Sequence, residues 1–117
     1  MVNLKVAVIG SREAAGFDIE RIGKFLPVNC TQIISGGAVG VDSAAEYYAK
    51  KNGIAFRKIL PDYERHGRHA PLIRDTQIVE ESELVLAFWD FHSRGTSFTI
   101  GECIRLGVPV RIIDLKD

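Results

Sequence analysis

Short apolar runs alternate with segments of helical periodicity along the whole chain. The runs cover residues 4–9, 31–34, 54–60, 84–89 and 108–113, and their length and β-branched character are typical of buried strands. Helices are predicted over residues 17–26, from residue 41 onward, and over 72–82 and 96–106. Residues 62–70 are polar without periodicity, which predicts a loop.

Strict alternation of strands and helices predicts an α/β fold with right-handed crossovers. We expect a single-domain, Rossmann-like three-layer sandwich over residues 1–117, with about five parallel strands and helices on both faces. In such sheets, ligands bind beyond the carboxyl ends of the strands. The polar turns after the first, second and fourth strands should therefore converge on a ligand site.

The turn after the second strand, SGGAVGVD, is the strongest candidate for an anion site. Its members Ser35, Gly36, Gly37 and Gly40 join a strand to a helix, where free N–H groups and the helix dipole attract phosphate. The turn has neither the Lys-Ser/Thr pair of a P-loop nor G-x-G-x-x-G spacing. Asp42, in the first turn of the helix, either caps free N–H groups or binds a ligand hydroxyl.

The turn after the first strand contains Gly10, Ser11 and Arg12. A hydroxyl and a guanidinium both bind phosphate well, and the guanidinium can match two oxygens at once. In the alternative interpretation, Ser11 caps the first helix and Arg12 is solvated.

The turn after the fourth strand predicts a second anion cradle. Gly95, Thr96 and Ser97 begin a helix with free N–H groups and two hydroxyls, and Arg94 could close over a bound anion. Ordinary N-capping is the alternative role of the two hydroxyls.

Aromatic side chains and basic residues near these turns leave further alternatives open. Phe91 and Phe98 could stack on a base, whereas Trp89 is expected in the core. The arginines between residues 57 and 74 form either a solvated face or a lid over an anion.

Composition limits the partners. Hydrophobic residues make up 46% and charged residues 26% of the chain, as in ordinary globular domains, and the formal net charge of +0 argues against nucleic acid as a partner. No apolar run approaches the length of a membrane span. Cys30 and Cys103 form no C-x-x-C or Cys/His cluster that could hold zinc, so we expect no metal. A reducing cytoplasm is the simplest interpretation of only two cysteines. We also expect no cofactor.

Four segments, VAVIGSRE, ISGGAVGVDSAAEYY, IRDTQIVEESELVLAFWD and SRGTSFTIGE, resemble the SLOG superfamily, which includes the Lonely Guy phosphoribohydrolases and DNA-processing protein A. SGGAVGVD is similar to the SGG-x-x-G-x-D signature of DNA-processing protein A. Arg74 resembles the arginine of the Lonely Guy enzymes, and Gly95-Thr96 resembles the end of their PGG-x-GT loop. The resemblance implies a single SLOG-like nucleotide-binding domain.

These observations favour a protein that binds a small phosphorylated, nucleotide-like ligand. One alternative is a phosphoribohydrolase of nucleoside 5′-monophosphates with Arg74 and Glu102 as its catalytic pair. Glu102 stands one helical turn later than the glutamate of the Lonely Guy pattern. Single-stranded DNA binding is the second alternative, and a homodimer or higher homo-oligomer is compatible with the helix stripes.

Overall fold

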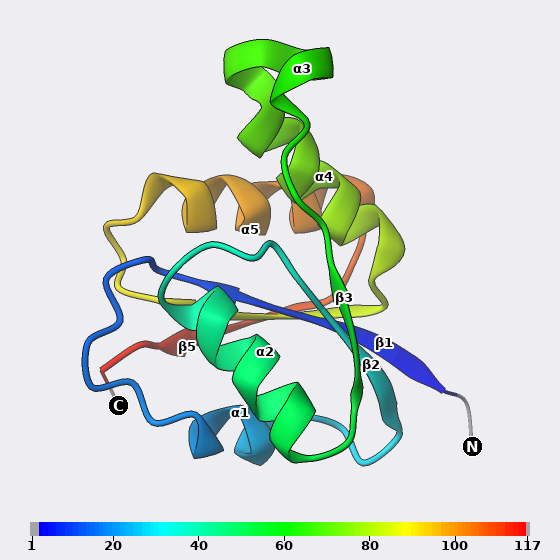
Figure 1. The fold of residues 1–117 in the computed structure, drawn as a ribbon, viewed down its shortest axis with the longest axis vertical. Helices are drawn as coiled ribbons and strands as arrows, with labels where there is room; N and C mark the ends of the chain where they lie inside the picture. Colours follow the sequence, from blue (N-terminus) through cyan, green and yellow to red (C-terminus); the bar gives the residue numbers. More distant parts are fainter. Residues whose placement is uncertain (1–2, 117) are drawn as a thin grey trace.

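The five strands form one parallel sheet in the order β3-β2-β1-β4-β5 (Figure 1). The computed structural model describes residues 3–116. The strands are β1 (Leu4–Gly10), β2 (Cys30–Ser35), β3 (Ala55–Lys58), β4 (Leu84–Trp89) and β5 (Val110–Asp114). The chain adds β2 and β3 on one side of β1 and then crosses to β4 on the other. The strand order therefore reverses between β1 and β4, where such sheets bind ligands.

Helices cover both faces of the sheet, as expected from the sequence. Helices α1 (Glu20–Phe25) and α2 (Val41–Lys51) lie on one face, and α4 (Ala70–Glu81) and α5 (Arg94–Leu106) lie on the other (Figure 1). Successive side chains of β1 alternate between the two faces: Val6 and Val8 enter one core, and Ala7 and Ile9 enter the other. The continuous apolar run of this strand follows from its cover on both faces. None of the helices within residues 3–116 is long and apolar enough to cross a membrane.

Two predicted elements differ from the structure. The first helix is shorter than residues 17–26 and begins only at Glu20, whose N–H donates to the Asp18 carboxylate at 3.0 Å. The loop predicted over residues 62–70 is wrong. It contains α3 (Tyr63–His66) and the 3-10 turn η1 (Gly67–His69), which continues directly into α4. The Asp62 carboxylate caps α3 by accepting from Arg65 N at 3.1 Å, and the segment projects beyond β3 (Figure 1).

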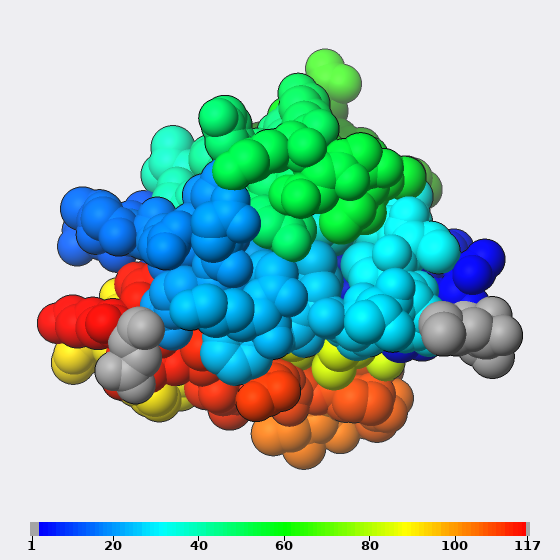
Figure 2. Space-filling model, turned by 90° about the horizontal axis from the view of Figure 1, so that it is seen from below, coloured from blue at the N-terminus to red at the C-terminus, as the bar shows by residue number. Residues whose placement is uncertain are grey.

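Arg21 connects α1 to the end of β5. Its buried guanidinium donates to the carbonyl oxygens of Leu115 at 2.6 Å and Asp114 at 2.7 Å. It also lies 5.7 Å from the centroids of the Phe17 and Phe88 rings. From below, the blue residues of the α1 region fill the middle of the face, above the red residues of the C-terminal strand (Figure 2).

The turns after β1 and β2 touch through their backbones at Gly40. This residue has φ 84°, and a Cβ there would overlap the carbonyl oxygens of Ser11 and Arg12. The next residue, Val41, donates its N–H to the Ser11 carbonyl at 3.2 Å. Glycine therefore satisfies two requirements at position 40, a left-handed backbone and close approach of the neighbouring turn.

Replacement of Gly40 should test this contact against a matched control. Gly53 also has a positive φ, but a Cβ there would meet no atom within 4 Å. We expect Gly53→Ala to cost about 1 kcal/mol of unfolding free energy from backbone strain. Gly40→Ala should cost at least about 3 kcal/mol, because overpacking adds to the same strain. Urea unfolding of both variants measures the difference, and equal losses would show that the turns are not in close contact.

Candidate functional site

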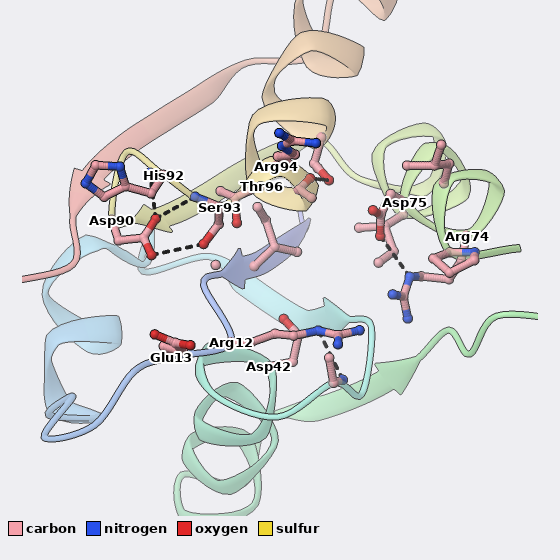
Figure 3. Close-up of a pocket in the computed structure, with 18 residues that line it drawn as sticks. Arg12, Glu13, Asp42, Arg74, Asp75, Asp90, His92, Ser93, Arg94 and Thr96 are labelled. Atoms are coloured by element: carbon pink, nitrogen blue, oxygen red, sulfur yellow. Dashed lines mark hydrogen bonds and ion pairs between the residues drawn. The ribbon is translucent and has the colours of Figure 1, made fainter. Parts of the chain in front are cut away.

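A pocket of about 480 Å³ lies beyond the carboxyl ends of β1 and β4 (Figure 3). Its wall combines the turns after β1, β2 and β4 with residues of α4 and of the N-terminal part of α5. The polar residues that line it are Arg12, Glu13, Asp42, Arg74, Asp75, Asp90, His92, Ser93, Arg94, Thr96 and Thr99. Gly10 and Gly95 contribute backbone, and Ile9, Ala38, Pro71, Leu72 and Ile78 supply the apolar part.

Ser11 joins the three turns without lining the pocket. It is fully buried, and its N–H donates to the Phe88 carbonyl at 3.2 Å. Its own carbonyl accepts from Val41 N at 3.2 Å, and its Oγ accepts from Asp90 N at 3.1 Å. Ser11 therefore positions the turns after β2 and β4, and it neither caps α1 nor faces the pocket.

The glycine turn after β2 contributes less to the pocket than the sequence predicted. Ser35, Gly36, Gly37 and Gly40 do not line it, and Ala38 and Asp42 are the contributions from this part of the chain. The Ser35 hydroxyl is buried and donates to the Val8 carbonyl at 2.6 Å. The glycines instead allow close packing of backbone against neighbouring elements.

Gly36 illustrates this role. A Cβ at this position would lie 2.8 Å from Arg74 Nη1 and 3.0 Å from Asp42 Oδ2. The absence of a side chain lets the guanidinium and the carboxylate approach the turn.

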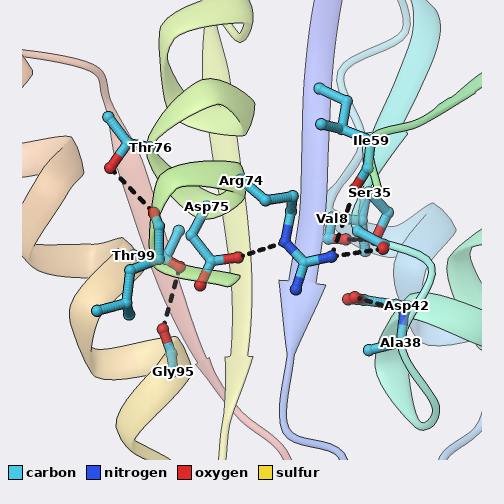
Figure 4. A network of polar contacts seen from close by, with 12 residues as sticks. Val8, Ser35, Ala38, Asp42, Ile59, Arg74, Asp75, Thr76, Gly95 and Thr99 are labelled. Carbon is cyan, nitrogen blue, oxygen red and sulfur yellow. Dashed lines mark hydrogen bonds and ion pairs between the residues drawn. The ribbon is translucent and has the colours of Figure 1, made fainter. Parts of the chain in front are cut away.

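Arg74 is buried, and its Nε and Nη1 groups donate hydrogen bonds to acceptors of the protein itself (Figure 4). Nη1 donates to the Gly36 carbonyl at 2.7 Å and to the Ile59 carbonyl at 3.3 Å. Nε donates to Asp75 Oδ1 at 2.8 Å. The side chain thus fastens α4 to the ends of β2 and β3, and only Nη2 has no hydrogen-bond partner in the described part of the chain.

Two carboxylates lie at the floor of the pocket. Asp42 is 7% exposed and accepts from Ala38 N at 3.2 Å. Burial raises its pKa from the ordinary value of 3.8 to about 6, although the Ala38 N–H, Ser35 and Arg74 oppose the change. Burial also raises the pKa of Asp75, against the opposing effect of Arg74. The floor is therefore acidic and desolvated, which suits hydrogen-bond donors of a ligand.

Asp90 shapes the turn after β4. Its carboxylate accepts from the N–H groups of His92 and Ser93, both at 2.8 Å, and from Ser93 Oγ at 3.0 Å. These hydrogen bonds, led by the one from His92, lower its pKa to about 2. Because the Ser93 hydroxyl binds Asp90, it does not cap α5.

The N-terminus of α5 faces the pocket without a side-chain cap. Among residues 3–116, no acceptor binds the N–H groups of Arg94, Gly95 or Thr96, and the first backbone bond of the helix starts at Ser97 N. Thr96 lines the pocket, whereas Ser97 is exposed outside it. The free N–H groups on which the prediction of a second anion cradle depends therefore lie beside the pocket together with Thr96, whereas Ser97 is not part of the lining.

Glu102 does not line the pocket. Its carboxylate accepts from Thr76 Oγ1 at 2.8 Å and forms an ion pair with Arg105 at 2.8 Å. These contacts, Arg105 first, lower its pKa to about 2. The structure therefore does not assemble Arg74 and Glu102 as a pair at the pocket.

Arg12 and Arg94 are the available cations of the pocket. Both are exposed, and neither forms an ion pair within the described part of the chain. Arg12 comes from the turn after β1, and Arg94 is the first residue of α5 (Figure 3). No cluster of three side chains able to hold a metal ion occurs among residues 3–116.

Several lining residues were missed by the sequence reasoning. Asp90 directly follows a buried strand at its carboxyl end, a signal that could have identified it. Thr99 follows Gly95 by one helical turn, so helical spacing could have predicted that it lies on the same face of α5 as Gly95. Its hydroxyl donates to the Gly95 carbonyl at 3.0 Å. Asp75 carried no such signal, because only the packing of α4 turns it toward the pocket.

Comparisons with known proteins identify relatives of the chain. Residues 1–66, more than half of the chain, match the model of the family described as DNA recombination-mediator protein A. DNA processing protein A from Streptococcus pneumoniae has a similar structure, with a TM-score of 0.78 and 20% identity over 94% of this chain. The match spans 50% of that protein, so this chain corresponds to half of its length. A search of curated protein sequences finds no match.

Two further structures share the fold. The protein TM1055 has a TM-score of 0.74 and 20% identity, over 92% of this chain and 72% of its own. DNA processing protein A from Helicobacter pylori has a TM-score of 0.71 and 18% identity, over 97% of this chain and 69% of its own. That structure is described in terms of its single-stranded DNA binding mode. The argument from net charge against nucleic acid finds no support in these comparisons.

The raised pKa of Asp42 predicts a pH-dependent stability. Between pH 3.8 and about 6 the folded chain keeps a proton that the unfolded chain releases, so this stabilising contribution is lost as pH rises to 6. The loss is on the order of 2–3 kcal/mol. We expect Asp42→Asn to gain stability relative to the unmodified protein between pH 5 and pH 7.5, measured by urea unfolding.

Asp90→Asn supplies the matched control. Because the pKa of Asp90 lies at about 2, its contribution is lost only as pH falls through the acid range. The Asp90 variant should therefore be less stable by the same amount at pH 5 and at pH 7.5. A constant difference for the Asp42 variant as well would show that its carboxyl is not desolvated.

Proposed function

Because the chain belongs to the DNA recombination-mediator protein A family, within the SLOG superfamily, we propose that its pocket binds a nucleotide or nucleotide-derived ligand. The observation that carries the proposal is that Arg12 and Arg94, which form no ion pair among residues 3–116, lie beside the uncapped start of α5. Two cations and a set of free N–H groups form a binding site for phosphate.

The mixed charge of the pocket orients the ligand. A phosphate beside Arg12, Arg94 and Thr96 stays at the cationic side, away from the floor. Asp42 would repel a phosphate placed directly on it, but its carboxylate accepts hydrogen bonds from the sugar hydroxyls of a ligand. A nucleotide combines an anionic end with a donor-rich end, which matches both parts of the pocket. The proposal is binding without a catalytic step, because Glu102 lies outside the pocket lining.

Calorimetric titration against mononucleotides, dinucleotides and ADP-ribose tests the proposal. Binding should be saturable and should require the phosphate, so the matching nucleosides should bind much more weakly. Folded protein that gives no heat with any member of the panel would refute nucleotide binding.

The cytoplasmic location and the homo-oligomeric state stay predictions. The structure describes Cys30 and Cys103 as free thiols, which accords with a reducing compartment. Burial raises the pKa of Cys103 to about 11, so this thiol stays protonated and unreactive at neutral pH.

Single-stranded DNA is the second candidate ligand, favoured by the family match and by the described binding mode of the Helicobacter pylori protein. The same cations would then contact the backbone of a strand. The salt dependence of oligothymidylate binding tests this alternative, because each phosphate contact adds about 0.7 to the slope of log affinity against log salt. Absence of binding, or a slope near zero, would exclude it.

Removal of the free guanidinium groups should separate binding from stability. We expect Arg12→Ala and Arg94→Ala each to weaken nucleotide binding by about 10- to 100-fold, because each removes a charge-assisted contact to phosphate. Thermal unfolding should change little, since both side chains are exposed and form no ion pair among the described residues.

Arg68→Ala is the matched control. Arg68 is an exposed guanidinium on η1 and does not line the pocket. This variant should bind with unchanged affinity. Equal weakening by Arg68→Ala would mean that the ligand responds to total charge and not to this pocket.

A further inference from the structure

Phe91 has an unusual backbone conformation. Among residues 3–116 it is the one residue other than glycine with a positive φ, at 66°. A bulky side chain in this left-handed region is disfavoured by contacts with its own backbone. Glycine or asparagine would adopt the same conformation with less strain. The aromatic ring therefore occupies this position at a cost to stability.

The surrounding hydrogen bonds hold Phe91 in place. The Asp90 carboxylate spans the residue by accepting from His92 N and Ser93 N, both at 2.8 Å. Asp90 N in turn donates to the buried Ser11 Oγ at 3.1 Å. The strain cannot be relieved by a local change of the turn without loss of these bonds, and strain of this kind is concentrated at functional sites.

The Phe91 ring packs against Trp89 and is still more than half exposed. Its centroid lies 4.9 Å from that of Trp89 at an interplanar angle of 43°, and 53% of the residue is exposed. Trp89 is fixed behind it, because its Nε1 donates to the Ser93 carbonyl at 3.0 Å and its ring packs against the core under α5. Ser93 lines the pocket and immediately precedes Arg94. Phe91 itself does not line the pocket, but both of its chain neighbours, Asp90 and His92, do. The exposed ring therefore belongs to the turn that borders the pocket and leads into Arg94 and α5.

We infer that Phe91 is a stacking platform for a nucleobase of the ligand whose phosphate lies at Arg94 and the start of α5. This inference rests on the proposed nucleotide binding. The base is carried either by a free nucleotide or by the next residue of a single strand, since both present the same π-face. Trp89 backs the ring, so stacking requires no rearrangement. The contact tolerates any base, because it uses no hydrogen-bond pattern.

The inference is tested by comparing adenosine 5′-monophosphate with ribose 5-phosphate, which lacks the base. Calorimetry should show that the nucleotide binds more tightly to the unmodified protein. Phe91→Leu and Phe91→Asn should weaken nucleotide binding by roughly 5- to 150-fold, the value of one stacked base. Ribose 5-phosphate should bind all three proteins equally.

Further variants separate the aromatic ring of Phe91 from its apolar bulk, from the backbone conformation at position 91 and from exposed aromatic residues elsewhere. Leucine keeps an apolar cover on Trp89, asparagine tolerates the left-handed backbone, and Phe91→Tyr should retain full affinity because it keeps the ring. Tyr47→Ala removes an aromatic residue of 63% exposure from α2, which is not part of the turn after β4, and should leave affinity unchanged. The midpoint temperature of thermal unfolding should be at least as high for Phe91→Asn as for Phe91→Leu, because asparagine adopts the left-handed backbone with less strain.

The possible results are distinguishable. Unchanged nucleotide affinity in both the leucine and the asparagine variant, or equal affinity of the two ligands for the unmodified protein, refutes the platform and leaves phosphate binding intact. Absence of binding by either ligand and by hexathymidylate refutes the proposed function together with the platform. An effect on hexathymidylate alone assigns the base to a single strand, and an effect on the mononucleotide assigns it to a free nucleotide.

Discussion

The position of α4 at the pocket depends on the buried guanidinium of Arg74. By donating to the carbonyl oxygens of Gly36 and Ile59, it ties α4 to the ends of two strands at the edge where the pocket forms. Loss of the side chain would leave two carbonyl groups without their donor, a typical cause of large destabilisation. Because the protein itself uses Nε and Nη1, only Nη2 of this side chain remains for a ligand within the described residues, and the phosphate contacts of the proposed function come from Arg12 and Arg94.

The pocket therefore contains charges of both signs, of which some are paired within the protein and others are available to a ligand. Asp75 is neutralised by Arg74 and Asp90 is saturated by its own turn, so neither presents a bare charge to a ligand. The buried Asp42 carboxylate can accept further hydrogen bonds besides the one from Ala38 N. The guanidinium groups of Arg12 and Arg94 are exposed to solvent. Under the proposed function, this arrangement would favour a molecule with separate anionic and donor groups over a simple inorganic anion.

The sequence predicted the sheet well, because a central parallel strand must be apolar on both faces, and five such runs are readily found. The missed helix at Tyr63–His66 is too short for periodicity and depends on a single cap from Asp62. The turns that converge at the pocket were also predicted, since strand order alone brings them together. Side-chain direction was not, and the adjacent residues Ser11 and Arg12 show why: one is buried between the turns and the other faces the pocket.

Ser11 has a further consequence for the thermodynamics of recognition. Its N–H, carbonyl and hydroxyl oxygen hold three turns in one arrangement before any ligand arrives. A preorganised site loses little conformational entropy on association, so a larger share of the contact energy remains as affinity. The heat-capacity change of binding should then reflect the small apolar area that the ligand covers, without a contribution from the ordering of loops.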